Sequence, residues 1–345
     1  MPVDAQITAD PPPQAIAFQL SRGSIVGRAM QTATKLGVPD ALGGNARTYQ
    51  EVAQATGTNA DRMRRLLRAL ASLDVVRDLG GGMFELTPVG NCLRADVPGS
   101  LRPMLLLGDS LWGELEFLPD CVKTDRNAFE LRHGQAPFAY IAQHPERAAI
   151  FNDAMSALSA ATGAALPQAY DFANVRRIVD VAGGHGTVLA SILKAHPHLH
   201  GTLLDMPSVV EGARPLLARE GVADRCEVAA GDMFASVPAD GDLYLLTHII
   251  HDWDDAPASQ ILQSCRRAMG PDARLLIVDL VLPERVEASP RAAGEMLFDL
   301  AMMVAMGGRE RTAAEIEALL GTAGLRLERV ISLPIPDRVV EAAPA

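Results

Sequence analysis

The chain has 345 residues, of which 48% are hydrophobic and 21% charged, so we expect a globular protein long enough for two cores. Its formal net charge of −11 argues against a general nucleic-acid binder, because such proteins need a basic surface to meet phosphates. The four scattered cysteines include no CxxC pair and are expected to be free thiols of a reducing compartment. The apolar runs are too short for a membrane span, and residues 1–13 do not resemble a secretion signal. We therefore expect a cytoplasmic protein with no membrane partner.

Residues 1–100 have a helical, arginine-rich pattern. The apolar spacing of residues 14–35 predicts an amphipathic helix. Thr48 and Glu51 stand at capping-box spacing before a short second helix, and a third helix is predicted over 59–73. Two strands around the glycines at 80–82 would then form a hairpin. Two helices followed by a two-stranded wing are typical of a winged-helix unit.

Beyond residue 100 the sequence pattern changes from helical to an alternation of strands and helices. Residues 101–170 have a helical pattern, whereas from about residue 175 short apolar runs alternate with helical stretches. Such alternation predicts a parallel sheet covered by helices on both faces, and therefore an α/β domain over 171–345. The apolar runs are 178–181, 201–204, 226–228, 243–247 and 275–278, and the helical stretches are 188–194, 209–217, 257–269 and 313–322.

A glycine-rich turn, AGGHG at positions 182–186, follows the first apolar run. Small residues let the backbone approach a ligand, and open sheets bind ligands beyond the carboxyl ends of their strands. The spacing is not GxGxxG, so a dinucleotide fingerprint is not met. Asp205 ends the next run, 19 positions after Gly186, where an acidic residue typically accepts hydrogen bonds from a ribose diol. We favour this role over that of a helix cap before Pro207.

Two further strand ends complete the pattern. After the third run, the Asp232 carboxylate could accept a hydrogen bond from an adenine amine, and Met233 could cover the ring, which together indicate a nucleoside site. After the fourth run comes His251, whose near-neutral pKa would let it take a proton from a hydroxyl. His248 is interpreted as a packing or surface histidine. Trp253 either stacks on adenine or fills the core at the entrance to the following helix.

These motifs occur in the order DVAGGHG, LLDMPSVV, GDMF, HDWDD and GGRERT. In this order the chain resembles the small-molecule O-methyltransferases, a family that includes plant caffeate and flavonoid enzymes, animal hydroxyindole O-methyltransferase and bacterial enzymes that tailor antibiotics. The resemblance covers the whole chain. It implies a homodimer with a Rossmann-like, S-adenosylmethionine-binding α/β domain behind a mostly helical, winged-helix dimerisation domain. The domains would be 1–100 for dimerisation, 101–170 for a helical linker that contributes to the substrate pocket, and 171–345 for catalysis.

The resemblance also implies roles for individual residues. His251 would be the general base, flanked by the acidic Asp279 and Glu310. The expected acceptor is a hydroxyl of a small aromatic secondary metabolite such as a phenolic polyketide or a phenazine. The implied cofactor-binding residues are Ala182, Gly183, Gly184, Gly186, Asp205, Met206, Asp232, Met233, Phe234, Thr247 and Trp253. The implied substrate-binding residues are Phe151, Met155, Ala301, Met302 and Met306.

Three residues depart from the family pattern. Ala182 replaces a glycine, which we expect to be tolerated only if its φ angle is negative. Thr247 replaces a cofactor-contacting lysine, and Asp279 is one methylene shorter than the glutamate of the plant enzymes. No metal is expected, because the nearest histidine cluster, at 196–200, lies at the opposite edge of the predicted sheet from the site.

Two alternatives stay open. Some relatives of this family methylate nitrogen or carbon, or bind the cofactor without methylating. A DNA-binding regulator is the second alternative, because the predicted helix 59–73 carries four arginines where a recognition helix would lie. Residues 45–95 nevertheless contain seven arginines against five acidic residues, a weak basic excess within an acidic chain.

Overall fold

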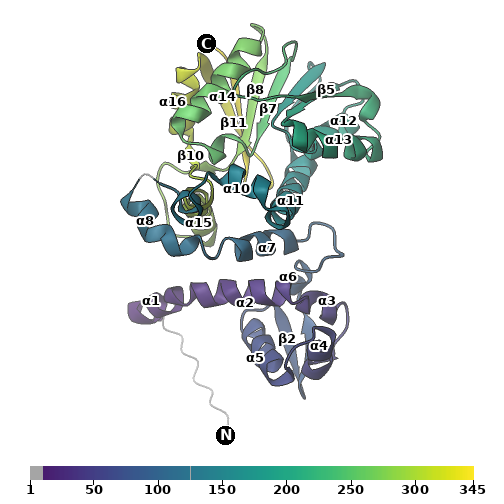
Figure 1. Cartoon of the computed structure of the whole chain (residues 1–345), viewed down its shortest axis with the longest axis vertical. Helices are drawn as coiled ribbons and strands as arrows, with labels where there is room; N and C mark the ends of the chain where they lie inside the picture. The colour runs from purple at the N-terminus through teal and green to yellow at the C-terminus, as the bar shows by residue number, and fades with distance from the viewer. Residues whose placement is uncertain (1–10, 125) are drawn as a thin grey trace. The chain divides into compact units, whose positions relative to one another are not determined.

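The computed structural model describes residues 11–124 and 126–345. The chain divides into two compact units, with the boundary between Ser110 and Leu111 (Figure 1). We describe each unit by itself. In the described parts of the chain, no helix has the length and apolarity needed to cross a membrane.

The first unit is helical with a small three-stranded sheet. The predicted helix over 14–35 is divided in two, because the chain turns at Arg22 before the weak helix former Gly23. The sheet has the order β1-β3-β2, so a short strand before the second predicted helix extends the predicted hairpin. Its elements are α1 (Pro13–Ser21), α2 (Gly23–Lys35), α3 (Val38–Leu42), β1 (Arg47–Thr48), α4 (Tyr49–Ala55), α5 (Ala60–Ala71), β2 (Val76–Gly80), β3 (Met83–Leu86), α6 (Pro88–Asn91) and α7 (Arg102–Ser110).

Local capping defines the helices of the winged-helix unit. Thr48 accepts a hydrogen bond from the Glu51 backbone, and the Glu51 carboxylate accepts one from the Thr48 backbone at 2.7 Å, so the predicted capping box is confirmed. Asn59 caps α5 with a single hydrogen bond, since its side-chain oxygen accepts from the Arg62 N–H at 3.0 Å. The core of the unit contains fully buried residues such as Leu42 and Leu67. The predicted winged-helix architecture is therefore present.

The first two helices keep many apolar side chains in contact with solvent. No residue of α1 is buried, and α2 buries only Ala33 and Thr34. Large apolar side chains on water-facing helices are typical of surfaces that meet another protein. Those exposed on the two helices are Ile16, Phe18, Leu20, Ile25 and Val26.

The second unit contains a seven-stranded sheet of order β11-β12-β8-β7-β4-β5-β6. The five strands that the sequence predicts run parallel, as expected. Two strands that the sequence did not predict make the sheet mixed, because β12 pairs antiparallel with both β8 and β11. The strands are β4 (Arg177–Val181), β5 (His200–Asp205), β6 (Cys226–Ala230), β7 (Leu243–Thr247), β8 (Arg274–Asp279), β11 (Leu325–Ser332) and β12 (Arg338–Pro344).

Helices cover both faces of this sheet. On one face α14 (Asp255–Ala268) and α16 (Ala313–Thr322) enclose a core with β7 and β8. On the other face α12 (Thr187–Ala195), α13 (Pro207–Arg219) and the end of α11 (Pro145–Ala169) enclose a second core. This doubly covered α/β arrangement is the Rossmann-like architecture that the resemblance implies.

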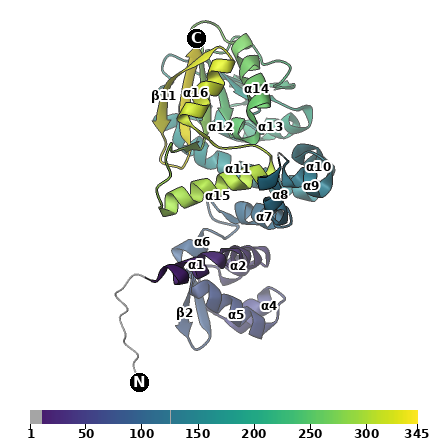
Figure 2. The same cartoon turned by 90° about the vertical axis from the view of Figure 1, so that its left-hand side faces the viewer.

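Further helices gather at one end of the sheet in both views (Figures 1 and 2). They include α8 (Leu118–Lys123), α9 (Ala128–His133), α10 (Pro137–Gln143), α11 and α15 (Pro290–Ala305). Ring contacts join this layer to the loop after β7, since Phe138 of α10 stacks on Trp253 and Phe298 of α15 lies 6.2 Å from the His251 ring. The layer therefore covers the carboxyl end of a central strand. A short parallel pair, β9 (Val281–Leu282) with β10 (Arg311–Thr312), also lies in this unit.

Candidate active site

The glycine-rich turn and Asp205 meet at the carboxyl ends of β4 and β5. The two Asp205 carboxylate oxygens accept hydrogen bonds from the backbone N–H groups of Gly184 and Met206, each at 2.7 Å. Gly184 and Gly186 both have positive φ angles, of 61° and 81°. A Cβ atom on Gly183 would lie 2.3 Å from the Asp180 carboxylate, so only glycine fits there. The turn therefore depends on its glycines and is tied to Asp205.

Ala182 adopts the conformation that we expected it to avoid. Its φ angle is +57°, so the turn accommodates alanine although the negative angle that we set as the condition is not met. For a residue with a Cβ atom this left-handed conformation costs roughly 1–2 kcal/mol. Backbone hydrogen bonds of the next residue hold the turn, since the Gly183 N–H donates to Leu204 and the Gly183 carbonyl accepts from Gly186. The shape of the turn thus overrides the preference of the alanine.

A buried carboxyl group that sequence reasoning missed lies directly below this turn. Both carboxylate oxygens of Asp180 are buried, and neither has a hydrogen-bond partner within residues 11–124 and 126–345. Burial raises the pKa of Asp180 to about 7, and the nearby Asp205 charge acts in the same direction. The signal was present in the sequence, because Asp180 is an acidic residue inside an otherwise apolar strand.

The residues around the turn fit S-adenosylmethionine. That molecule combines a ribose with a positively charged sulfonium and an ammonium group, so it needs hydrogen-bond acceptors and negative charge rather than phosphate-binding donors. Asp180 and Asp205 provide the carboxyl groups, and the hydroxyl of Thr247 is a further buried polar group without a partner in the described structure. Unpaired buried polar groups are costly, so a ligand that pairs with them binds favourably.

The motif after β6 lies next to the aromatic residues of the site. Asp232 accepts a hydrogen bond from the Phe234 N–H at 2.9 Å, which shapes a tight turn. The Phe234 ring stands edge-on to Trp253, with centroids 5.0 Å apart, and Trp253 stacks on Phe138 at 5.8 Å. Met233, Phe234 and Trp253 all pack against the sheet core. Trp253 therefore packs against the core, which is one of the two roles considered for it.

His251 lies in a short 3₁₀ turn, Ile250–Asp252, and is only 7% exposed. Its Nδ1 atom is 2.7 Å from Oε1 of Glu310. In its ionised form the Glu310 carboxylate can only accept a hydrogen bond; it then holds the proton on Nδ1 and leaves the lone pair of Nε2 available. Burial raises the pKa of Glu310 to about 8, while His248 is the leading group that opposes this rise.

Asp279, the other predicted acidic partner, is placed differently. Among the described residues, its buried Oδ1 atom has no hydrogen-bond partner, and the hydrogen bond of His251 Nδ1 goes to Glu310 instead. Burial raises the pKa of Asp279 to about 7, against the opposing effect of His251. The structure therefore pairs the histidine with Glu310, whereas Asp279 acts on it only through its charge.

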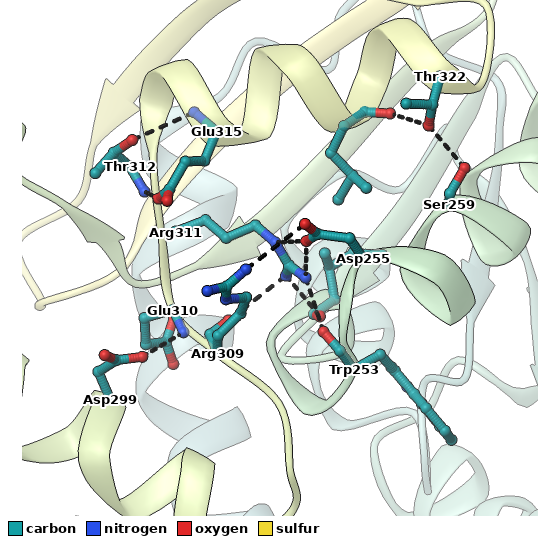
Figure 3. A network of polar contacts seen from close by, with 12 residues as sticks. Trp253, Asp255, Ser259, Asp299, Arg309, Glu310, Arg311, Thr312, Glu315 and Thr322 are labelled. Atoms are coloured by element: carbon teal, nitrogen blue, oxygen red, sulfur yellow. Dashed lines mark hydrogen bonds and ion pairs between the residues drawn. The ribbon is translucent and has the colours of Figure 1, made fainter. Parts of the chain in front are cut away.

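A buried arginine holds the loop that carries the histidine (Figure 3). The Arg311 guanidinium donates to the carbonyls of Ile250 and Trp253, at 3.1 and 2.8 Å, on either side of His251 and Asp252. The same guanidinium contacts one carboxylate oxygen of Asp255, at 2.9 and 3.1 Å. Its side chain is only 3% exposed. Arg311 thus fixes the loop at both ends.

The segment before Arg311 packs against the backbone of the same loop. The Arg309 N–H donates to the His251 carbonyl at 2.9 Å. A Cβ atom on Gly308 would lie 2.0 Å from that carbonyl, so glycine is required for this approach. The Glu310 N–H donates to Asp299 of α15 at 2.8 Å (Figure 3). The GGRERT segment therefore supplies Glu310 and holds the histidine loop at the same time.

His248 is not the surface or simple packing residue that we expected. Its side chain is 11% exposed, and its Nε2 atom lies 2.9 Å from Oδ2 of Asp337. Its φ angle is +54°, which is rare for a residue with a side chain. Asp337 precedes β12, which sequence reasoning missed, so this pair had no signal in the sequence.

The residues predicted to contact the acceptor lie on two helices of the same layer. Phe151 and Met155 are one turn apart on α11, and the Phe151 ring stands edge-on to Phe138 at 6.2 Å. Met302 is 7% exposed, on α15. The same helix carries Phe298, which sequence reasoning did not select although its ring lies 6.2 Å from the His251 ring. The other predicted contacts are Ala301 on α15 and Met306 at its C-cap.

No group of three or more His, Cys, Asp or Glu side chains among the described residues has a geometry suited to a metal ion. The histidines at 196–200 have structural partners instead. His196 and His198 lie within hydrogen-bond distance of the carbonyls of Pro167 and Phe172, at 3.1 and 3.2 Å.

Comparison with known proteins identifies the class. Residues 114–326 match an O-methyltransferase domain, and residues 18–96 match an O-methyltransferase dimerisation domain. The chain is 38% identical to phenazine O-methyltransferase PhzM of Lysobacter antibioticus, over 96% of this chain and 97% of the relative. It is 32% identical to a phenazine-1-carboxylate N-methyltransferase of Pseudomonas aeruginosa, over 95% and 96%.

A solved structure shows the same fold. NcsB1, an O-methyltransferase from neocarzinostatin biosynthesis, was crystallised with S-adenosylmethionine and 2-hydroxy-5-methyl naphthoic acid. It is 30% identical to this chain, with a TM-score of 0.79, and the match covers 93% of this chain and 96% of NcsB1. The fold and site thus define an S-adenosylmethionine-dependent methyltransferase. The chain belongs to the O-methyltransferase family, with that family's dimerisation domain.

Proposed function

We propose that this enzyme methylates a hydroxyl group of a small aromatic secondary metabolite and that His251 removes the hydroxyl proton. The observation that carries the proposal is the 2.7 Å contact between His251 Nδ1 and Glu310. It directs the basic Nε2 away from the carboxylate, so that this atom can accept a proton from an acceptor hydroxyl. In the resulting imidazolium, Glu310 would stabilise the new positive charge.

We assign the cofactor to the loops at the carboxyl ends of β4 to β7. When bound, S-adenosylmethionine supplies a methyl group already activated for displacement from its sulfonium. Asp205 would accept hydrogen bonds from the ribose, Asp232 would accept one from the adenine amine, and Asp180 would lie close to the positive charge. The glycines of the turn would allow close approach of the backbone. The supporting contacts would come from Ala182, Met206, Met233, Phe234, Thr247 and Trp253.

An aromatic acceptor suits the residues that surround the base. Phe298 lies 6.2 Å from the His251 ring, and Phe151, Met155, Met302 and Met306 are on or next to the helices of the same layer. Aromatic rings and thioethers pack well on flat, polarisable ligands. The relatives that act on phenazines and the naphthoic acid held by NcsB1 support the same class of acceptor.

The functional test uses a panel of hydroxylated phenazines, naphthoates and simple phenols with S-adenosylmethionine, and mass spectrometry to detect a methylated product. His251→Ala should lower kcat by about 10²–10⁴, the range typical of a positioned general base. His198→Ala is the matched control, since this histidine lies just before the amino end of β5, away from the carboxyl ends that form the site, and its Nε2 atom is within hydrogen-bond distance of the Phe172 carbonyl. Nearly intact turnover by His251→Ala would contradict the general base.

Methylation of nitrogen is the second candidate, favoured by the similarity to an N-methyltransferase. An amine acceptor needs no strong base before it attacks, so turnover would then depend little on His251. The same panel should therefore include amino analogues of each hydroxylated compound. Faster turnover of the amines, together with a mild His251→Ala effect, would favour this candidate.

We further propose that the protein is a homodimer formed through the first unit. The match to a dimerisation domain and the exposed apolar side chains of α1 and α2 support this assembly. Sedimentation velocity on the purified chain would measure it directly.

A further inference from the structure

The GGRERT segment, residues 307–312, follows α15 and carries Glu310 between two arginines. One of its backbone donors binds another backbone group, since the Arg309 N–H donates to the His251 carbonyl at 2.9 Å. The Glu310 N–H differs, because its acceptor is a side chain, Oδ1 of Asp299, at 2.8 Å (Figure 3). The peptide that carries the partner of the base is therefore held by a carboxylate.

The side chain of Glu310 has few contacts of its own to fix it. It is completely buried, and its Oε1 atom contacts His251 Nδ1 at 2.7 Å. Its Oε2 atom has no hydrogen-bond partner within the described parts of the chain. Because a single contact does not fix a carboxylate, its place beside the imidazole depends on where the backbone puts it. The hydrogen bond from the Glu310 N–H to Asp299 thus bears directly on the contact with the base.

Asp299 lies on a helix that is itself firmly packed. Near the end of α15, Val304 is 2% exposed and forms a small core with Cys121 of α8 and Ala128 of α9. The residue before Asp299 is Phe298, whose ring lies 6.2 Å from the His251 ring. Groups that rest on a packed helix are placed more exactly than groups on a free loop. Helix α15 therefore offers a rigid support for the loop segment that carries Glu310.

We propose that Asp299 is a positioning residue, which holds the Glu310 peptide so that the Glu310 carboxylate meets Nδ1 of His251. Asp299 acts through the backbone of Glu310 and needs no contact with the acceptor or the cofactor. A displacement of about 1 Å can lower the rate of an enzyme by about 100-fold, so the loss of this hydrogen bond should be measurable. The inference rests on the proposed function, in which His251 is the base.

Three substitutions of Asp299 separate its geometry from its charge. Asp299→Asn keeps an accepting oxygen at the same distance from the backbone and removes the charge. Asp299→Glu keeps the charge but is one methylene longer, and Asp299→Leu keeps the branched shape without any acceptor. We expect kcat to stay close to the wild-type value in Asp299→Asn, to fall by about 100-fold in Asp299→Leu, and to lie between these in Asp299→Glu. A higher kcat in Asp299→Glu than in Asp299→Asn would show that charge matters and would refute the inference.

The balance between kcat and KM distinguishes positioning from damage to the helix. In Asp299→Leu the KM for the acceptor should stay unchanged, because Asp299 binds the Glu310 backbone. Disturbance of α15 as a whole would raise KM, because the helix carries Phe298. The matched control is Glu295→Leu, one turn earlier on α15, where the native carboxylate pairs with Arg291 at 2.7 Å and does not hold the segment. An equal loss of kcat in this control, or a rise in KM that accounts for the loss in Asp299→Leu, would indicate a merely structural role.

A double-mutant cycle tests whether Asp299 acts through Glu310. In a Glu310→Ala background no carboxylate remains to be positioned, so Asp299→Leu should not lower the single-turnover rate further. An undiminished loss in that background would show that Asp299 acts by another route, and it would overturn the proposal.

A further measurement needs no acceptor. ¹⁵N NMR of the histidine-labelled protein, at a pH where the ring is neutral, reports the tautomer of His251, whose signals are assigned by their absence in His251→Ala. We expect one tautomer, fixed by the Glu310 contact, in the wild type and in Asp299→Asn, and a mixture of tautomers in Asp299→Leu as in Glu310→Ala. The same single tautomer in all four proteins would contradict the inference. If Asp299→Leu does not fold, Asp299→Glu replaces it in each measurement.

These experiments separate the two proposals. If His251→Ala abolishes turnover but Asp299→Leu leaves both kcat and the tautomer unchanged, only the present inference fails. If no hydroxylated acceptor is methylated, the proposed function fails, and the NMR measurement alone decides whether Asp299 positions Glu310.

Discussion

The arginine that holds the histidine loop offers a quantitative test. In Arg311→Lys a single ammonium group replaces a planar fork that contacts two carbonyls and a carboxylate. Lysine can keep the contact with Asp255, but it cannot reach Ile250 and Trp253 together. The Asp255 side chain is 64% exposed, so its ion pair contributes little and the two carbonyls decide the outcome.

The magnitude follows from those two carbonyls. Two carbonyls left without partners would cost about 2–6 kcal/mol, and since the Ile250 carbonyl still accepts from the Trp253 N–H at 3.3 Å, we expect a loss near the lower end of that range in the free energy of unfolding. Displacement of the His251 loop by about 1 Å should lower kcat by about 100-fold. Binding of S-adenosylmethionine should weaken less than kcat falls, because most of its proposed site lies on the loops after β4, β5 and β6 and only Thr247 and Trp253 lie near the displaced loop.

The assay combines urea unfolding, kcat and calorimetric binding of S-adenosylmethionine. Arg309→Lys is the matched control, because Arg309 is a neighbouring arginine that contacts the same Asp255 at 3.6 Å with a half-exposed side chain. We expect that control to lose less than about 0.5 kcal/mol. If Arg311→Lys proves equally mild in both stability and kcat, the reasoning about the loop is refuted.

Three further predictions concern single residues. Gly308→Ala would place a Cβ atom 2.0 Å from the His251 carbonyl. The variant should therefore lose nearly all methyltransferase activity while circular dichroism still reports a folded protein. Normal turnover would exclude the steric argument. The pKa of Asp180 is about 7 in the folded protein, against an ordinary value of 3.8. The protonated side chain therefore stabilises the fold at low pH, and this stabilisation is lost as the pH rises through 7. Relative to Asp180→Asn, the wild type should therefore lose about 4 kcal/mol between pH 4 and pH 8 in urea unfolding, and a pH-independent difference would contradict the assignment. Phe18→Asp, at a side chain that is 58% exposed on α1, should shift sedimentation from dimer towards monomer without changing the helical content; an unaltered dimer would place the interface elsewhere.

Much of the fold could be predicted from local sequence. The alternation of apolar runs and helical stretches predicted five parallel strands and the helices between them, because each element's periodicity reflects its own burial. The helix caps at Thr48 and Asn59 could also be predicted, because a cap depends on residues only three positions apart. The strand ends then placed Asp205, Asp232 and His251 at one edge of the sheet, since parallel strands share the direction of their carboxyl ends.

Other features depend on contacts between distant parts of the chain. β12 was missed because its burial comes from β8 and β11 on either side, and not from a strongly apolar sequence of its own. Ala182 does not meet the condition of a negative φ angle because the turn, not the residue, determines its conformation.

The glycine-rich turn, Asp205 and His251 could be named from the sequence alone, because each follows directly from a strand and a short motif. Only the tertiary structure decided that Glu310, 59 residues further along, pairs with the histidine while Asp279 does not. It also decided that Asp337, 89 residues from His248, holds a second imidazole beside the first. The physical reason is that such pairs are set by how loops pack across the end of the sheet, and residue spacing along the chain carries no record of that packing.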